Sequence, residues 1–396
     1  MNQWKEPVTA VLEKHGDLLF SLGCRIFDHP ELGREEIYAS GLLTTFLEER
    51  GFVVERGTGG RETAFRATWE RGSGGPSIGF MMEYDALRGL GHGCGHHLQG
   101  PVCIGAALAL MELCDAPFKL VLYGTPDEES RGGKITMEQQ GCFRDVDVML
   151  AYHTGGSASI SYKNKALAPI RVTFHGKPAH ASGAPWNGRS AMDAMLLAFH
   201  GLEILREHVK DGCRIHYTIL EGTGPSNIVH EQAKTHITLR ADDRRYLEEL
   251  QGRMENVIKG ACLMTDTTAD IQPLNVYWNL IPVESLRKTA LQAARTLEAE
   301  RLKEGEPHGK GSTDVGNVSW VVPTVYLTTF YDDHGAHTEP YRDAGKSQQA
   351  KKAMLSGAGI LCLTAMQLIR DRELLQTVKA EHQAAVTADQ GGNEHV

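Results

Sequence analysis

The stretch from Glu83 to Gly100, EYDALRGLGHGCGHHLQG, combines many metal-capable side chains with many glycines. It contains two carboxylates, one cysteine, three histidines and five glycines. This much glycine disfavours a helix, but it lets a backbone fold tightly around a bound ion. Thiolate, imidazole and carboxylate groups are the usual ligands of zinc and its neighbours. The stretch therefore predicts a metal site.

Other strand-like segments end in groups of the same kind. The groups are Asp127, Glu128 and Glu129 after FKLVLYG, His153 after DVDVMLAY, and Asp332, Asp333, His334 and His337 after PTVYLTTF. Because ligands of open α/β sheets bind outside the carboxyl ends of the strands, we expect these groups to converge. The adjacent carboxylates Glu128 and Glu129 can divide the work. One can bind a metal while the other moves a proton from water to a leaving amine.

The elements that must position these groups alternate between strands and helices. Strand-like runs include PSIGFMMEYDAL, FKLVLYG, DVDVMLAYHTG and PTVYLTTF, with helical periodicity between them. This alternation predicts an α/β domain with a mixed, mostly parallel sheet. We place it at residues 1–165 and 282–396, and expect the polar tail that follows Asp371 to be loose.

The middle of the chain, residues 166–281, has a different character. Four strand-like runs, APIRVTFHGKPAH, CRIHYTILEG, QAKTHITLRADD and ADIQPLNVYW, surround two strongly periodic helices. Their order, βαββαβ, is that of the ferredoxin-like unit. We therefore expect an inserted ferredoxin-like domain.

Composition limits the classes of function. The 396 residues are 41% hydrophobic and 23% charged, which is typical of a globular enzyme. The net charge of −9 argues against nucleic-acid binding, which needs a basic face. Neither a continuous apolar run of membrane-spanning length nor a signal peptide is evident, so we expect no membrane partner and a cytoplasmic location. The eight cysteines show no paired framework and are expected to be thiols.

Six blocks in chain order carry a family resemblance. They are HPELGREEIYASGLLTTFLEERGFVVERG, EYDALRGLGHGCGH, GTPDEESRGGKITMEQQGCF, FHGKPAHASGAPWNGRSAMDA, HGKGSTDVGNVSWVVP and AHTEPY. The chain resembles the metallopeptidase family of aminoacylase, carboxypeptidase G and dipeptidases over nearly its whole length. Within that family it is most similar to the subgroup of p-aminobenzoyl-glutamate hydrolase and the indoleacetyl-amino-acid hydrolases. The resemblance implies a zinc-peptidase-like catalytic domain with an inserted lid and dimerisation domain.

The resemblance also implies roles for particular residues. The metal ligands would be Cys94, His96, Glu129, His153 and His337. They would hold one or two Zn²⁺ or Mn²⁺ ions. Glu128 would be the general acid/base, and Asp85 would orient a ligand. His180 would reach the active site of a partner subunit and stabilise an oxyanion there. Asn227 and Arg240 would bind a substrate carboxylate, for which a planar guanidinium is well suited.

Several residues depart from the family pattern. Arg88 replaces the usual proline of DALPG, and His97 stands where Asn or Asp is usual. The acidic turn is DEESRGG instead of AEE followed by glycines, and YDDHGAH precedes the last ligand. These changes add charge around the pocket, so we expect Arg88 and His97 to contact the substrate.

The leading hypothesis is a metal-dependent hydrolase of a C–N bond. The expected substrate is an N-acyl amino acid or a dipeptide-like amide, often aromatic, that carries a carboxylate. An alternative is hydrolytic deamination of an aromatic amine with a carboxylate, and a third is an inactive scaffold of the same fold. The expected assembly is a homodimer formed through the inserted domain, or a higher homo-oligomer.

Overall fold

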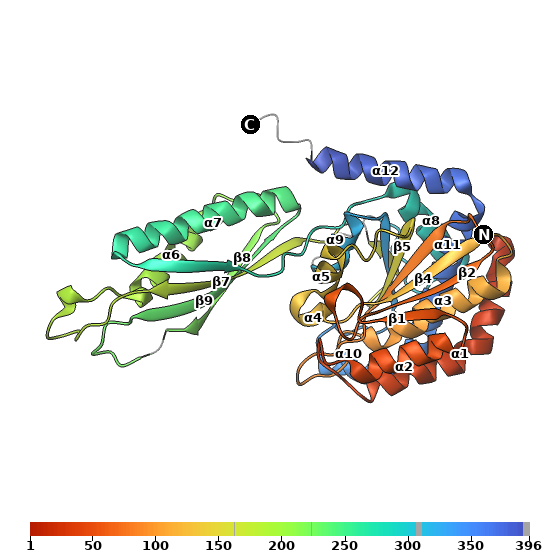
Figure 1. The fold of residues 1–396 in the computed structure, drawn as a ribbon, viewed down its shortest axis with the longest axis horizontal. Helices are drawn as coiled ribbons and strands as arrows, with labels where there is room; N and C mark the ends of the chain where they lie inside the picture. The colour runs from red at the N-terminus through yellow and green to blue at the C-terminus, as the bar shows by residue number, and fades with distance from the viewer. Residues whose placement is uncertain (162, 223, 306–310, 391–396) are drawn as a thin grey trace. The chain divides into compact units, whose positions relative to one another are not determined.

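The structure is a computed structural model that describes residues 1–161, 163–222, 224–305 and 311–390. The chain forms two compact units (Figure 1). One unit comprises Lys165–Asn279 together with Gly311 and Ser312. The other comprises Met1–Asn164 and nearly all of the chain from Leu280 onward. The smaller unit is thus an insertion in the larger one.

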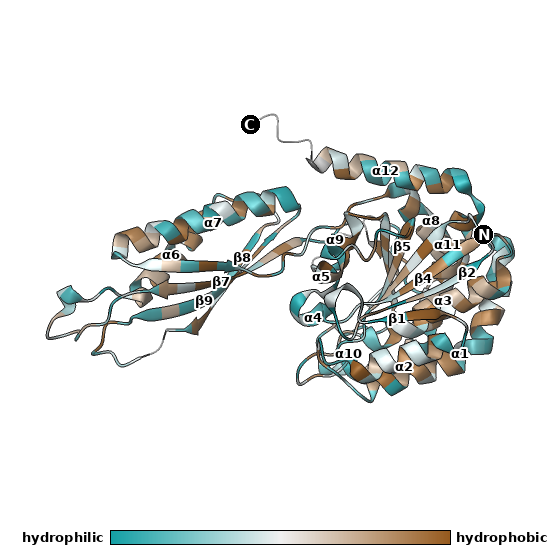
Figure 2. Ribbon diagram, in the orientation of Figure 1, coloured by the Kyte–Doolittle hydropathy of each residue, from teal (hydrophilic) through white to brown (hydrophobic). Residues whose placement is uncertain are grey.

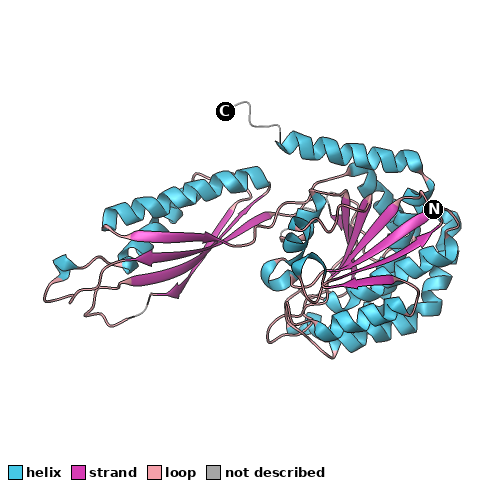
Figure 3. Cartoon of the chain, in the orientation of Figure 1, coloured by secondary structure: helices cyan, strands magenta, loops and turns pink. Residues whose placement is uncertain are grey.

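The larger unit is built on a seven-stranded sheet (Figure 3). Its strand order is β1-β2-β4-β3-β5-β11-β6. The strands are β1 (Val53–Arg56), β2 (Phe65–Arg71), β3 (Ser77–Met82), β4 (Phe118–Gly124), β5 (Val148–Gly155), β6 (Ser159–Ser161) and β11 (Thr324–Phe330). The four central strands β4, β3, β5 and β11 run parallel, whereas β1, β2 and β6 add antiparallel pairings. The mixed, mostly parallel sheet expected from the sequence is confirmed.

Both faces of this sheet are buried. In β4, Leu120 and Leu122 belong to one apolar cluster, and Val121 and Tyr123 to the other, as the two-residue period of a strand requires. The first cluster is covered by helices α1 (Lys5–Phe27), α2 (Ile37–Glu48), α3 (Gln99–Leu113), α8 (Glu284–Thr296) and α11 (Gln348–Arg370). The second is covered by the short helices α5 (Gly133–Gln139) and α9 (Val315–Ser319).

Helix α11 is a core helix. Among the described residues it is the one helix long and apolar enough to cross a membrane by length and composition. However, 78% of its most apolar 18-residue window is buried inside the fold. Within the fold α11 packs against β11 and β5.

The inserted unit is a four-stranded antiparallel sheet with two helices. Its strand order is β10-β7-β9-β8. The elements are β7 (Ala166–His175), α6 (Ala191–Arg206), β8 (Arg214–Glu221), β9 (Gln232–Ala241), α7 (Arg244–Thr265) and β10 (Thr268–Pro273). Both helices begin at a side-chain cap: Ser190 accepts from the Asp193 N–H, and Asp243 accepts from the Tyr246 N–H. The predicted βαββαβ order is confirmed.

The expectation of a loose tail was wrong for most of its length. Helix α12 spans Arg372–Gln390, and residues 391–396 lie outside the described residues. Its buried side chains Leu375, Val378, His382 and Val386 recur at helical spacing. The polar composition of the tail hid this narrow apolar stripe, which is visible as brown patches on a largely teal helix in Figure 2.

Candidate metal centre

The candidate residues converge because parallel strands end at one edge of the sheet. Glu83 and Asp85 follow the last residue of β3, and Glu128 and Glu129 begin the short helix α4 (Glu128–Arg131) after β4. His153 lies near the end of β5. The segments after β3, β4 and β11 and the end of β5 thus supply one cluster of side chains.

The glycine-rich loop after β3 takes a conformation that only glycine adopts easily. Gly89, Gly91 and Gly95 have φ of 76°, 75° and 79°. A Cβ atom on Gly95 would lie 2.2 Å from the Thr154 hydroxyl oxygen. That hydroxyl donates to the Cys94 carbonyl at 3.1 Å. The tight approach to β5 fixes the position of Cys94.

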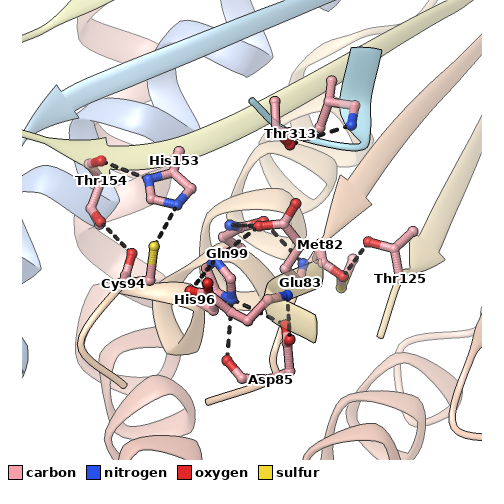
Figure 4. Close-up of polar contacts among 12 residues, drawn as sticks. Met82, Glu83, Asp85, Cys94, His96, Gln99, Thr125, His153, Thr154 and Thr313 are labelled. Carbon is pink, nitrogen blue, oxygen red and sulfur yellow. Dashed lines mark hydrogen bonds and ion pairs between the residues drawn. The ribbon is translucent and has the colours of Figure 1, made fainter. Parts of the chain in front are cut away.

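Cys94 lies at the centre of the cluster. Candidate ligand atoms of Cys94, His96 and His153 all lie within 4.8 Å of one another, and so do those of Cys94, Glu129 and His337. The Cys94 Sγ is 3.4 Å from His153 Nε2 (Figure 4). Glu129 Oε1 is 3.5 Å from His337 Nε2. One thiol is therefore common to two separate groups of three potential ligands.

The buried atoms of this cluster suit a cation. His96 Nε2 and Glu129 Oε1 are both buried and make no hydrogen bond of good geometry within the described residues, although His96 Nε2 lies 3.1 Å from Glu83 Oε2 and Glu129 Oε1 lies 3.5 Å from His337 Nε2. Buried polar atoms without a good hydrogen bond cost free energy unless another group satisfies them. Burial raises the pKa of the Cys94 thiol to about 12. A cation would satisfy both atoms and displace the thiol proton. The donor set of sulfur, imidazole and carboxylate fits a transition metal.

Asp85 orients two of these side chains. Its Oδ1 lies 3.1 Å from His96 Nδ1 (Figure 4), and its Oδ2 accepts the Glu129 backbone N–H at 2.9 Å. With Nδ1 engaged by Asp85, the other ring nitrogen of His96 faces the cluster. This is the usual arrangement of a histidine that binds metal.

Glu128 and Glu129 have opposite electrostatic environments. Burial, followed by the negative charges of Glu83 and Asp314, raises the pKa of Glu128 well above its ordinary value. Although burial also disfavours ionised Glu129, its close contact with His337 and the charge of His96 lower its pKa to about 2. The pKa values of these adjacent carboxyl groups are thus shifted in opposite directions. This suits Glu128 to carry a proton and Glu129 to stay an anionic ligand.

A buried ion network that sequence reasoning missed lies beside Glu128. The Lys134 ammonium is fully buried and lies 2.6 Å from both Glu83 Oε1 and Asp314 Oδ1. Gln99 Nε2 donates to the other oxygen of Glu83 at 2.6 Å. Despite burial, Lys134 and His96 hold the pKa of Glu83 at about 2. The carboxylates of Glu83, Glu128 and Asp314 approach within 4.8 Å of one another, so Lys134 balances a local excess of negative charge.

His97 and Arg88, expected to contact substrate, are not in the cluster. His97 is fully buried, its Nε2 lies 3.0 Å from the Gly345 carbonyl oxygen, and its ring contacts Phe27 edge-on at 5.0 Å. Successive residues of the 3₁₀ turn His96–Leu98 point in different directions, which explains the separation of the two histidines. Arg88 is exposed on the glycine-rich loop. Their role with substrate stays a prediction.

The other expected residues lie in the inserted unit. The loop of His180 and that of Asn227 pair through the bridge His180↔Ile228 and the bond from Ala181 N–H to the Asn227 carbonyl. The Nδ1 of His180 accepts the Gly183 N–H at 3.0 Å. Arg240 is half-buried and donates to Ser312 Oγ at 2.9 Å.

Comparison with known proteins identifies the chain's family. A family model described as a peptidase dimerisation domain matches residues 162–264. The chain is 34% identical to Xaa-Arg dipeptidase of Mus musculus over 98% of its length and 94% of that protein. The chain belongs to the M20 peptidase family. This M20 chain is a hydrolase that acts on C–N bonds, which confirms the reaction class expected from the sequence.

This M20 chain is also similar to a second sequence relative and to a solved structure. It is 30% identical to one of the p-aminobenzoyl-glutamate hydrolase chains of Escherichia coli, over 91% of this chain and 90% of that protein. A Bacillus subtilis structure described as a dinuclear metal binding peptidase of the M20 family superposes with a TM-score of 0.69 at 16% identity, over 90% of this chain and 99% of that chain. The predicted fold of the M20 chain is thereby confirmed.

Replacing Lys134 by methionine tests the ion network. Lys134→Met leaves Glu83 and Asp314 buried without their cation, which should cost about 3–5 kcal/mol in the free energy of unfolding. Urea denaturation measures the loss. Lys379→Met is the matched control, because the Lys379–Asp147 pair has the same 2.6 Å separation but is half-exposed, and it should cost at most about 1 kcal/mol. Equal losses in the two variants would contradict the assigned role.

Proposed function

We propose that the chain is a metal-dependent hydrolase that cleaves the amide bond of an N-acyl amino acid or a dipeptide-like substrate. The observation that carries the proposal is the sharing of the Cys94 thiol by two groups of potential ligands. In this proposal Cys94, His96 and His153 would hold one Zn²⁺ or Mn²⁺ ion, and Cys94, Glu129 and His337 would hold a second.

The chain's own residues carry the proton and charge movements. When bound, the ions supply Lewis acidity, which polarises the scissile carbonyl and makes water a stronger acid. Glu128 takes the proton of the attacking water and returns it to the departing nitrogen. Its raised pKa suits it to hold that proton between the two steps. Glu129, kept anionic, remains a ligand throughout.

His180 is suited to stabilise an oxyanion. Backbone N–H groups of Ser182 and Gly183 donate to its Nδ1 at 3.2 and 3.0 Å. A neutral imidazole with an accepting Nδ1 carries its proton on Nε2. His180 therefore offers a fixed N–H donor from an exposed loop, as stabilisation of developing negative charge requires.

The relatives' names support the substrate class. Xaa-Arg dipeptidase and p-aminobenzoyl-glutamate hydrolase name substrates in which the leaving nitrogen belongs to an amino acid. Such leaving groups keep a free carboxylate, and the guanidinium of Arg240 suits it. We therefore propose that Arg240 and Asn227 bind this carboxylate, and we favour amides over aromatic amines.

A homodimer through the inserted unit completes the proposal. The matched dimerisation domain supports it, and so does β8, which ends the strand order of its sheet. Ile219 and Leu220 on this edge strand are 50% and 52% exposed. Exposed apolar edge strands favour pairing with another chain, and reciprocal pairing would give a two-fold dimer.

Substitution of Glu128 tests the proton carrier. Glu128→Gln should lower kcat about 10²–10⁴-fold without loss of metal, because an amide cannot carry the proton. The assay follows hydrolysis of p-aminobenzoyl-glutamate and of dipeptides ending in arginine. Its neighbour provides the contrast, since Glu129→Gln should also lose metal. A Glu128→Gln enzyme that keeps more than half of the wild-type rate would refute the assignment.

Paired histidine variants test the metal ligands. His96→Ala should bind less metal than the wild type, because the cluster loses one ligand. His97→Gln is the control, since this adjacent ring faces Phe27 and its loss should leave metal content unchanged. Mass spectrometry measures the number of metal ions bound per protomer in each variant. Equal metal content in the two variants would mean that His96 is not a ligand.

Mixed dimers test whether His180 of one protomer acts in the active site of the other. A His180→Ala protomer paired with a Glu128→Gln protomer would contain one intact site. Mixing the two inactive proteins should restore about a quarter of wild-type activity, because random pairing makes about half of the dimers mixed. Mixing Glu128→Gln with Glu129→Gln is the control and should restore nothing. If exchange of protomers is verified and the first mixture stays inactive, His180 does not act in the partner's site.

A further inference from the structure

The acidic turn depends on an uncommon backbone conformation. Asp127, directly before Glu128 and Glu129, has φ of 65° and is fully buried. Residues with a Cβ seldom adopt this left-handed conformation unless the surrounding structure holds them in it. Whatever holds Asp127 also sets the direction in which the two following glutamates leave the turn.

Glu36 holds the turn from a distant part of the chain. This side chain, just before α2, is fully buried. Its Oε1 accepts the backbone N–H of Asp127 at 2.8 Å, and its Oε2 accepts the Thr63 hydroxyl at 2.9 Å. Both oxygens of one carboxyl group are thus engaged, and one of them satisfies the backbone at the left-handed residue itself.

The same carboxyl group is linked to the loop after β3. The Thr63 carbonyl accepts the Tyr84 hydroxyl at 2.6 Å, and Tyr84 stands between Glu83 and Asp85 in the sequence. Asp85 in turn accepts the Glu129 N–H. Glu36 therefore connects, through short contacts, the two segments that supply the acidic residues of the candidate centre.

The surroundings of Asp127 leave the turn little freedom. Its Oδ2 lies 3.2 Å from the Arg61 guanidinium, and its carbonyl accepts the Gly133 N–H at 3.0 Å. A Cβ atom on Gly33 would lie 2.4 Å from Asp127 Oδ1, so the loop that carries Glu36 packs directly on the turn. The segment HPELGREE, which resembles the family pattern, therefore packs on the acidic turn and restricts its conformation.

We propose that Glu36 is a positioning residue: its carboxyl group fixes the left-handed turn at Asp127 and so aims Glu128 and Glu129 at the metal centre. The inference rests on the proposed function of those two glutamates. Glu36 itself does not touch substrate or metal. Its length matters, because a shorter side chain cannot reach both Asp127 and Thr63 from the same backbone position.

The charge of Glu36 matters less than its reach. Burial raises the pKa of Glu36 to about 7, so the neutral form is accessible near neutrality. A neutral amide of the same length can still accept from Asp127 and donate to the Thr63 oxygen. Two substitutions therefore separate the effect of side-chain length from that of charge. Glu36→Gln keeps the length, and Glu36→Asp keeps the carboxyl group but shortens the side chain.

The experiment compares kcat, KM and Mn²⁺ affinity of these two variants on the full-length protein. Glu36→Gln should stay close to wild type. Glu36→Asp should lower kcat about 10–10²-fold, because small misplacements of catalytic groups have effects of this size. Its KM should change little, and calorimetry should show weaker Mn²⁺ binding. Glu31→Asp is the matched control. Its carboxylate accepts the Tyr38 and Ala39 N–H groups at the start of α2, so the change should lower stability but leave kcat unchanged.

The outcomes distinguish this inference from the proposed function. A wild-type protein inactive on the amides would refute the proposed function, and Mn²⁺ affinity of the two variants would then still decide the role of Glu36. Glu36→Asp with wild-type kcat and Mn²⁺ affinity, or Glu36→Gln impaired as strongly as Glu36→Asp, would overturn the inference. If Glu36→Asp does not fold, Thr63→Val frees the same carboxyl group from one side. It should lower kcat more mildly, and an unchanged kcat would overturn the inference.

Discussion

Several carboxyl groups share a small buried volume at the edge of the sheet, and their mutual repulsion is the main constraint on this structure. Glu83, Glu128 and Asp314 approach one another within 4.8 Å. Buried like charges are tolerated only when cations or protons compensate them. The Lys134 ammonium compensates two of them directly. Burial, followed by the negative charges of Glu83 and Asp314, still raises the pKa of Glu128. The arrangement therefore holds one carboxyl group ready to carry a proton.

The same constraint explains the division of the site into two halves. On one side the chain supplies its own cation, Lys134, tied to segments after β3 and before α9. On the other side Cys94, His96 and Glu129 offer donor atoms suited to a metal, and His96 Nε2 and Glu129 Oε1 make no hydrogen bond of good geometry within the described part of the chain. Asp85 lies between the halves and fixes both His96 and the backbone of Glu129. An internal cation on one side and bound metal on the other would balance the negative charge.

The sequence was sufficient to predict the fold class and the convergence of the candidate ligands, because both follow from local pattern. Strands with two-residue periodicity alternate with helices, and chemically distinctive residues stand at the carboxyl ends of those strands. The roles of adjacent residues were harder to predict. His96 and His97 look alike in sequence, yet a 3₁₀ turn directs one ring toward the cluster and the other toward Phe27. Lys134, Asp314 and Glu36 were missed because their partners come from distant segments, although all three lie in blocks that resemble the family.

The proposed sharing of Cys94 by two metal ions is tested most directly by anomalous X-ray diffraction from crystals of the Mn²⁺- or Zn²⁺-loaded protein. We expect two anomalous peaks, each within bonding distance of Cys94 Sγ, one beside His96 and His153 and the other beside Glu129 and His337. Peaks among Glu83, Glu128 and Asp314, or well-occupied metal away from Cys94, would contradict the shared thiol.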